Sequence, residues 1–170
     1  GIYGQLGGKC ESGYIKGNFE VYYTKGFTWN ADLFADRINC RPVAERVAGK
    51  YISLSGTLDG KIEVQGRTTE ILGCQGELDL ATPGVFEIKS MDGLLKRLPP
   101  NTSIMKRDLL KIAIGTFQTY PYQRGVLKID YKPDGGTGLL KLDSPNGQRH
   151  LEMYWHPYET SGVANEADNR

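Results

Sequence analysis

In residues 51–66, "YISLSGTLDGKIEVQG", the aliphatic residues all lie at even-numbered positions: Ile52, Leu54, Leu58, Ile62 and Val64. Apolar side chains at every second position indicate a strand with one buried face. The Asp59-Gly60 pair between two such runs is a strong hairpin signal. A tight two-residue loop would pair Leu58 with Lys61 and turn Ile62 to the opposite face. The stretch therefore predicts a hairpin whose loop decides whether the two runs share a face.

The same alternation occurs before and after this stretch. In residues 13–35 the odd positions are apolar or aromatic: Ile15, Phe19, Val21, Tyr23, Phe27, Trp29 and Leu33. Two short strands follow at residues 78–88, around a Pro83-Gly84 turn. Three more are expected at 127–155, separated by turns at 133–136 and 145–147. The chain is therefore expected to be mainly β.

Three segments have helical character instead. Residues 42–49 begin with a proline and end with a glycine, which predicts one short helix. Leu94, Leu95 and Leu98 predict a second, ended by Pro99-Pro100. The longest follows Thr102 or Ser103 as N-cap, and its apolar stripe comprises Met105, Leu109, Ile112, Thr116 and Phe117. We expect one domain over residues 1–159 and a polar, disordered tail over 160–170.

Composition narrows the class of protein. The chain of 170 residues is one domain or one slice of a longer protein. Its 21 Lys and Arg nearly balance 20 Asp and Glu, which argues against a nucleic-acid partner. No apolar run approaches the roughly 20 residues needed to span a bilayer, and no signal peptide is visible.

Few residues suggest chemistry. Cys10, Cys40 and Cys74 fit no zinc spacing, and we interpret them as small half-buried apolar residues; one disulfide plus a free thiol is the alternative. His150 and His156 would lie on the same side of one strand without an identified partner. No nucleophile, metal or phosphate-loop motif is present. We therefore expect no enzyme, no metal and no cofactor.

Basic residues gather around the two later helices: Lys96, Arg97, Lys106, Arg107 and Lys111. Solvated helix faces account for them in most proteins. The rival interpretation is a patch that contacts anionic head groups or an acidic partner.

The apolar faces of the strands need a cover, and the chain supplies only two or three short helices. The helices could cover part of a curved sheet and leave a groove suited to acyl chains. Alternatively, the sheet folds over on itself and the core closes. Taken alone, the sequence favours the closed core, because most apolar faces pack against another layer.

An ordered set of glycine-rich phrases resembles AsmA-like proteins, in particular the C-terminal domain of YdbH-like proteins. "GGKCESGYIKG" (residues 7–17) resembles the opening of AsmA-like repeats. "LSGTLDGKIEVQGRTTEILGCQGELDLATPGVFEI" (54–88) and "LLKIAIGTFQTYPYQRGVLKIDYKPDGGTGLLKLDSPNG" (109–147) resemble the core, helix and hairpin of the YdbH-like domain. The resemblance covers residues 1–155. The chain departs from the family after Pro145-Asn146, where "HLEMYWHPYE" follows.

The resemblance implies a curved, largely antiparallel β-groove, with two or three short helices on or near its concave face. Such proteins are anchored in the inner membrane, cross the periplasm and are thought to conduct phospholipids to the outer membrane. It therefore implies a periplasmic location and a phospholipid or other acyl-chain ligand. The implied partner is a small outer-membrane lipoprotein or another envelope protein, and no enzymatic activity is implied.

On this hypothesis ten residues form one lipid-facing wall, and the helix over residues 105–117 lies against it or plugs its end. The ten are Ile52, Leu54, Leu58, Ile62, Val64, Leu78, Leu80, Phe86, Leu127 and Ile129. A continuous wall requires Leu58 and Ile62 to share a face. We therefore predict a three-residue loop over 59–61, or a bulge, that pairs these two residues.

A second hypothesis is a non-catalytic protein-binding or scaffold module with a closed β core. It would contact a protein through exposed aromatic residues, namely Tyr120, Tyr122, Tyr154 and Trp155.

Overall fold

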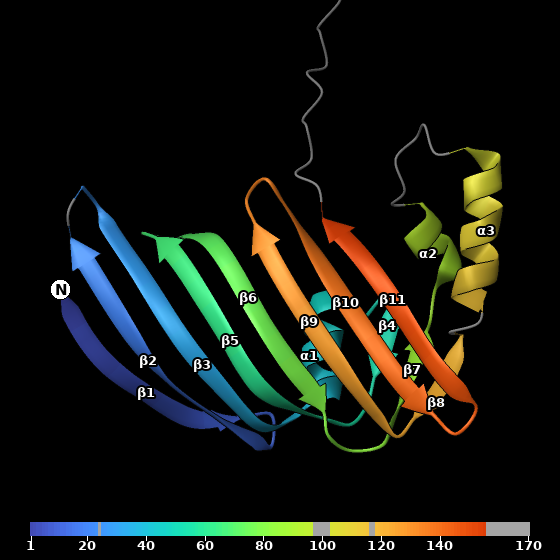
Figure 1. Ribbon diagram of the computed structural model, residues 1–170, viewed down its shortest axis with the longest axis horizontal. Coiled ribbons are helices and arrows are strands. Elements are labelled where there is room, and N and C mark those ends of the chain that lie inside the picture. The colour runs from blue at the N-terminus through green and yellow to red at the C-terminus, as the bar shows by residue number, and fades with distance from the viewer. Residues whose placement is uncertain (24, 97–102, 116–117, 156–170) are drawn as a thin grey trace, which may run out of the picture.

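The computed structural model describes residues 1–23, 25–96, 103–115 and 118–155. Over these residues the chain forms an eight-stranded antiparallel sheet, a three-stranded antiparallel sheet and three short helices (Figure 1). The large sheet has the order β1 (Ile2–Cys10), β2 (Gly13–Tyr23), β3 (Phe27–Asn39), β5 (Thr57–Arg67), β6 (Glu70–Leu80), β9 (Arg124–Lys132), β10 (Gly135–Ser144) and β11 (Gly147–Trp155). The small sheet has the order β4 (Ile52–Leu54), β7 (Gly84–Ile88) and β8 (Thr119–Tyr122). The helices are α1 (Cys40–Ala48), α2 (Met91–Leu95) and α3 (Ile104–Gly115).

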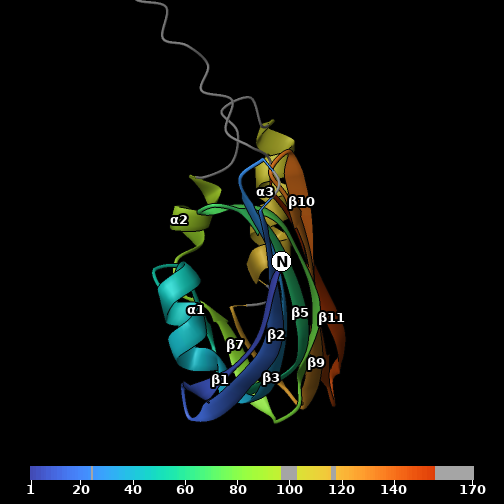
Figure 2. The same ribbon diagram turned by 90° about the vertical axis from the view of Figure 1, so that its left-hand side faces the viewer.

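The large sheet is curved and does not close into a barrel. Its concave side holds α1 and the small sheet (Figure 2). Within the described part of the chain, β1 and β11 each have one neighbouring strand and form the two edges. The predicted fold class, a curved and largely antiparallel sheet with short helices near its concave face, is confirmed.

The predicted hairpin at residues 59–61 is wrong. Thr57–Arg67 is one continuous strand, which pairs with β3 on one side and β6 on the other. Leu58 therefore lies opposite Ile38 and Leu80, and not opposite Ile62. Since β5 stays extended, Leu58, Ile62 and Val64 still share one face.

The Asp-Gly pair accommodates a bulge in the neighbouring strand. The register between β3 and β5 shifts between Ala35 and Ile38, and Arg37 there has a φ of 52°, in the left-handed region. The side chain of Asp59 accepts a hydrogen bond from the backbone N–H of Arg37 at 2.6 Å. Gly60 has a φ of 148°, which a residue with a side chain rarely adopts. Asp59 and Gly60 therefore support the pairing of β5 with β3 at the bulge, and they do not form a turn.

Helix α1 forms as the sequence predicts, two residues earlier. Asn39 is its N-cap, and the Asn39 side chain accepts a hydrogen bond from the backbone N–H of Arg41 at 3.1 Å. The guanidinium of Arg46 pairs with the carboxylate of Glu11, which follows β1. The cap and the ion pair fix α1 beside the β1–β2 turn.

Helices α2 and α3 lie where predicted, and α3 begins directly after Ser103. The α3 stripe does not pack on the sheet, because Met105, Leu109 and Ile112 are 75%, 60% and 69% exposed. The expectation that this helix lies against the apolar wall or plugs its end is therefore wrong for these residues. Arg97, Leu98, Pro99-Pro100, Thr102, Thr116, Phe117, His156 and the tail lie outside the described residues.

The core closes where the small sheet and α1 pack on one end of the large sheet. Phe86, Leu80 and Leu142 are almost fully buried there. The cluster combines residues of both sheets with α1: Ile38, Cys40, Ala44, Leu54, Leu58, Leu78, Leu80, Phe86, Ile88, Tyr120, Tyr122, Leu140 and Leu142. Tyr120 also ties the layers together, since its hydroxyl donates a hydrogen bond to the carbonyl oxygen of Gly147 at 2.8 Å.

Candidate functional site

One face of the large sheet is apolar across the strands. Residues that lie opposite one another in the register form rows, and three such rows contain no charged residue. The first row runs Gly8, Ile15, Ala35, Gly60, Leu78, Leu127, Leu140 and Leu151. The second row runs Leu6, Gly17, Leu33, Ile62, Gly76, Ile129 and Gly138. The third row runs Gly4, Phe19, Ala31, Val64, Cys74, Tyr131 and Gly136. We call this the apolar face.

The small sheet and α1 cover only one end of the apolar face. Leu78 and Leu140 of the first row are buried, whereas no side chain of the second or third row is. Toward the open end, Ile2, Ile71 and Tyr131 are 67%, 47% and 36% exposed. We call the second and third rows, together with Ile2, Val21, Trp29, Gly66 and Ile71 at their open end, the uncovered apolar face.

The uncovered apolar face is large enough for acyl chains. Six strand spacings of about 4.8 Å make it roughly 29 Å long from β1 to β10. One leaflet contributes about half of the 30 Å hydrocarbon core of a bilayer, so an acyl chain lying across the strands fits within this length. Glycines alternate with bulky residues in each row, and neighbouring atoms occupy the space that a Cβ would fill at Gly4, Gly17 and Gly76.

Two aromatic rings lie flat on this face because glycines oppose them. An added Cβ at Gly4 would overlap the ring of Phe19, and one at Gly66 would overlap the indole of Trp29. The indole N–H of Trp29 also donates a hydrogen bond to the carbonyl oxygen of Thr68 at 3.1 Å. The polar atom of this ring is therefore satisfied at the edge of the face, and the remaining surface is hydrocarbon-like.

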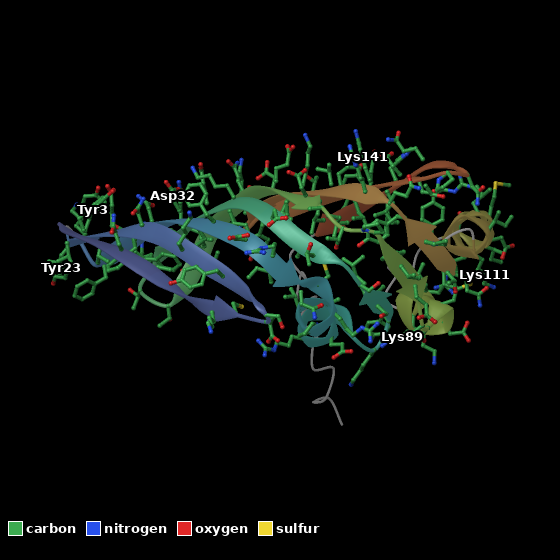
Figure 3. All side chains as sticks on the ribbon, turned by 90° about the horizontal axis from the view of Figure 1, so that it is seen from below. Tyr3, Tyr23, Asp32, Lys89, Lys111 and Lys141 are labelled. Carbon is green, nitrogen blue, oxygen red and sulfur yellow. The ribbon has the colours of Figure 1, made fainter. Side chains whose placement is uncertain are left out.

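The opposite face is polar and carries charges of both signs. Asp32 and Lys141 project from it on the convex side of the sheet (Figure 3). Lys128 pairs with Glu77 across β9 and β6 at 2.8 Å, and Lys61 lies 3.6 Å from Asp32. Two shallow hollows of about 270 and 160 Å³ occur on this side, lined mostly by polar residues. Ala31 and Val64 of the third row also line the first hollow, and Cys74 and Tyr131 also line the second, but most of the other lining residues belong to the polar face.

The ten predicted wall residues divide between two sheets. Seven lie on the same side of the large sheet as the apolar face, and Leu58 and Leu80 lie just beyond its first row: Leu58, Ile62, Val64, Leu78, Leu80, Leu127 and Ile129. Ile52, Leu54 and Phe86 belong to the small sheet, so the prediction of one wall is wrong for them. Leu54, Leu58, Leu78, Leu80 and Phe86 are buried by the chain itself and line no open surface. Ile62, Val64 and Ile129 lie on the uncovered apolar face, and Leu127 lies beside it.

The predicted aromatic surface is wrong for two of its four residues. Tyr120 and Tyr122 are only 7% and 2% exposed. The hydroxyl of Tyr122 donates a hydrogen bond to the carbonyl oxygen of Ser55, and burial raises the pKa of this phenol. Tyr154 is 62% exposed but lies on the polar face, where its hydroxyl bonds to Glu152. The backbone of Trp155 ends β11, and its side chain lies outside the described part of the structure.

The three cysteines are free thiols. Cys40 is buried, and Cys10 and Cys74 are partly buried. Burial raises the pKa of Cys40 to about 11 and raises that of Cys74 as well. His150 is exposed on the polar face. Among the described residues, no three His, Cys, Asp or Glu side chains converge to hold a metal ion, and no helix is long and apolar enough to cross a membrane.

The chain was compared with family models, curated proteins and solved structures, and nothing matched.

Sequence reasoning missed the contribution of β1–β3 to this face. Phe19, Val21, Trp29 and Leu33 were absent from the predicted wall, although their odd-position alternation was visible in the sequence. The glycines at alternate positions of β1, Gly4 and Gly8, were a further signal, because they continue the rows of the apolar face.

Proposed function

We propose that the protein is a non-enzymatic module that holds phospholipid acyl chains against its uncovered apolar face. On this proposal it is part of an AsmA-like, YdbH-like conduit that is anchored in the inner membrane and passes phospholipids through the periplasm. The observation that carries the proposal is the run of rows without a charged residue across β1–β10. Apolar surface of this extent is unfavourable in water and marks a binding surface.

The geometry favours acyl chains over a folded protein partner. Flat rings, small aliphatic side chains and glycines make a wall with few directional groups, and a flexible hydrocarbon needs none. Protein interfaces, by contrast, combine apolar residues with a polar rim and hydrogen bonds. The scaffold hypothesis also depended on Tyr120 and Tyr122, which are buried.

Native mass spectrometry tests the proposal on the chain incubated with a phosphatidylethanolamine and phosphatidylglycerol mixture. We expect bound phospholipid on the unaltered chain and loss of it in Val64→Glu, because an acyl chain that covers a carboxylate removes its hydration without supplying a partner. The matched control is Gln65→Glu, which places the same group one residue along β5 and on the polar face. A folded Val64→Glu chain that binds phospholipid like Gln65→Glu would refute the proposal.

A second variant covers the case in which Val64→Glu does not fold. Ile71 is 47% exposed near the start of β6, so Ile71→Glu leaves the core intact and still places a charge on the uncovered apolar face. It too should lose phospholipid. A charge at Leu54 would not separate binding from folding, because Leu54 is buried between the two sheets.

A further inference from the structure

Helix α3 presents a stripe of large apolar side chains to solvent. Ile104, Met105, Leu109 and Ile112 are 80%, 75%, 60% and 69% exposed. At 100° per residue, Met105, Leu109 and Ile112 fall within an arc of about 60°. Helix α3 contacts α2, and these three side chains remain largely exposed in the part of the chain that the structure describes.

The sequence around this stripe is basic. Residues 89–118 contain six Lys or Arg and two Asp, a net charge of +4, whereas the whole chain carries +1. Arg107 and Lys111 lie one turn apart, on the opposite side of α3 from Met105 and Leu109. Figure 3 shows Lys89 and Lys111 at this end of the molecule. The helix thus carries an exposed apolar stripe and, on the other side, Arg107 and Lys111, of which Lys111 lies 3.9 Å from Asp108.

We propose that α3 docks on the surface of an anionic lipid bilayer. Met105, Leu109 and Ile112 enter the boundary between head groups and acyl chains, and the basic side chains contact lipid phosphates. Its 12 residues make a helix about 18 Å long, shorter than the roughly 30 Å hydrocarbon core. The helix therefore lies in the plane of the interface.

Charge and composition favour a bilayer over other occupants. A second copy of the chain would bring two segments of charge +4 together, which opposes pairing. The helix carries no aromatic residue between Ile104 and Gly115, although aromatic residues anchor most protein interfaces. The proposal does not depend on lipid binding by the uncovered apolar face. If that face also binds lipid, α3 would place a membrane at the β11 end of the sheet (Figure 1).

Flotation with vesicles tests the apolar stripe. We expect the unaltered chain to bind vesicles that contain phosphatidylglycerol and to bind pure phosphatidylcholine more weakly. The triple variant Met105→Gln, Leu109→Gln, Ile112→Gln should lose binding at least about tenfold, while glutamine preserves helicity. The matched control replaces three exposed residues elsewhere, Tyr3→Gln, Val85→Gln and Tyr154→Gln, and should bind like the unaltered chain.

A charge series tests the head-group contact. Arg107→Glu with Lys111→Glu should abolish the preference for phosphatidylglycerol, whereas Lys16→Glu with Lys141→Glu, the same change in net charge on the polar face, should preserve it. The proposal is wrong if the triple glutamine variant binds as tightly as the unaltered chain. It is also wrong if the unaltered chain ignores anionic vesicles and instead dimerises through α3 or binds an acidic protein. Val64→Glu should still bind vesicles, so this variant distinguishes membrane docking by α3 from lipid binding by the uncovered apolar face.

Discussion

The carboxylate of Asp59 on β5 accepts a hydrogen bond from the backbone N–H of Arg37 on β3, at 2.6 Å. Arg37 has a left-handed backbone (φ 52°) at the bulge in β3, so its N–H is directed away from the regular ladder. We expect Asp59→Ala to lower the free energy of unfolding by about 1–2 kcal/mol, because a backbone donor loses a charged acceptor. Urea denaturation monitored by circular dichroism measures this loss.

Asp79 provides the control for this prediction, because it lies directly opposite Asp59 on β6. Asp79→Ala removes a like charge from the same face and should leave the stability unchanged or slightly higher. Equal losses in the two variants would show that the bulge does not depend on the Asp59 carboxylate.

The contact between Asp59 and Arg37 is also an example of what the sequence could not predict about the fold. Alternation predicted most strands, because one buried face forces period two wherever a strand crosses the core. The turns predicted at Pro133 and at Pro145-Asn146 are confirmed, since β9 ends at Lys132 and β10 ends at Ser144. The Asp59-Gly60 pair has the same local chemistry as a turn, and only the bulge in β3, a non-local feature, gives it another role.

The sequence likewise could not predict which strands belong to the large sheet and which to the small sheet. Leu54 and Leu58 have the same parity four residues apart, yet they belong to different sheets that face each other. The change occurs at Ser55-Gly56, where Gly56 has a φ of 111°. Alternation in the sequence indicates that a side chain is buried, but it does not indicate which strand or sheet that side chain packs against. The sequence could therefore predict that an apolar face exists, but not which strands form it or how much of it stays uncovered.

Apolar residues on the concave side of the large sheet should contribute very differently to stability at its covered and uncovered ends. Leu142 is fully buried beneath the small sheet, so Leu142→Ala should cost about 2–5 kcal/mol. Leu33 lies on a central strand of the uncovered apolar face, and Leu33→Ala should cost less than half as much. Chemical denaturation of both variants tests the difference. Similar losses would indicate that another layer covers Leu33 in solution.

The packing of Trp29 against Gly66 can be tested with one methyl group. An added Cβ at Gly66 would overlap the indole, so Gly66→Ala should lift the ring and cost about 1–3 kcal/mol. Trp29 fluorescence, read in a Trp155→Phe background, should change at the same time. In Gly73→Ala the nearest atom to the new Cβ is the Tyr131 carbonyl oxygen at 3.7 Å, so neither stability nor fluorescence should change.

The buried thiol of Cys40 makes stability depend on pH in the alkaline range. Its pKa in the folded chain is raised to about 11 by burial, against about 8.5 for an exposed thiol. Between these values the unfolded chain loses a proton that the folded chain retains. The free energy of unfolding should therefore be constant with respect to this group below about pH 8.5 and fall as the pH rises toward 11.

Cys40→Ala removes this titration and isolates its contribution. The variant has a smaller side chain in the core and should be less stable at neutral pH, but its stability should fall less steeply above about pH 8.5. Urea denaturation across the alkaline range gives the two slopes. Tyr122 and Cys74 also have raised pKa values through burial, so some alkaline loss should persist in the variant. Parallel slopes for the two chains would show that the Cys40 thiol ionises equally well when folded, which would contradict its buried position at the start of α1.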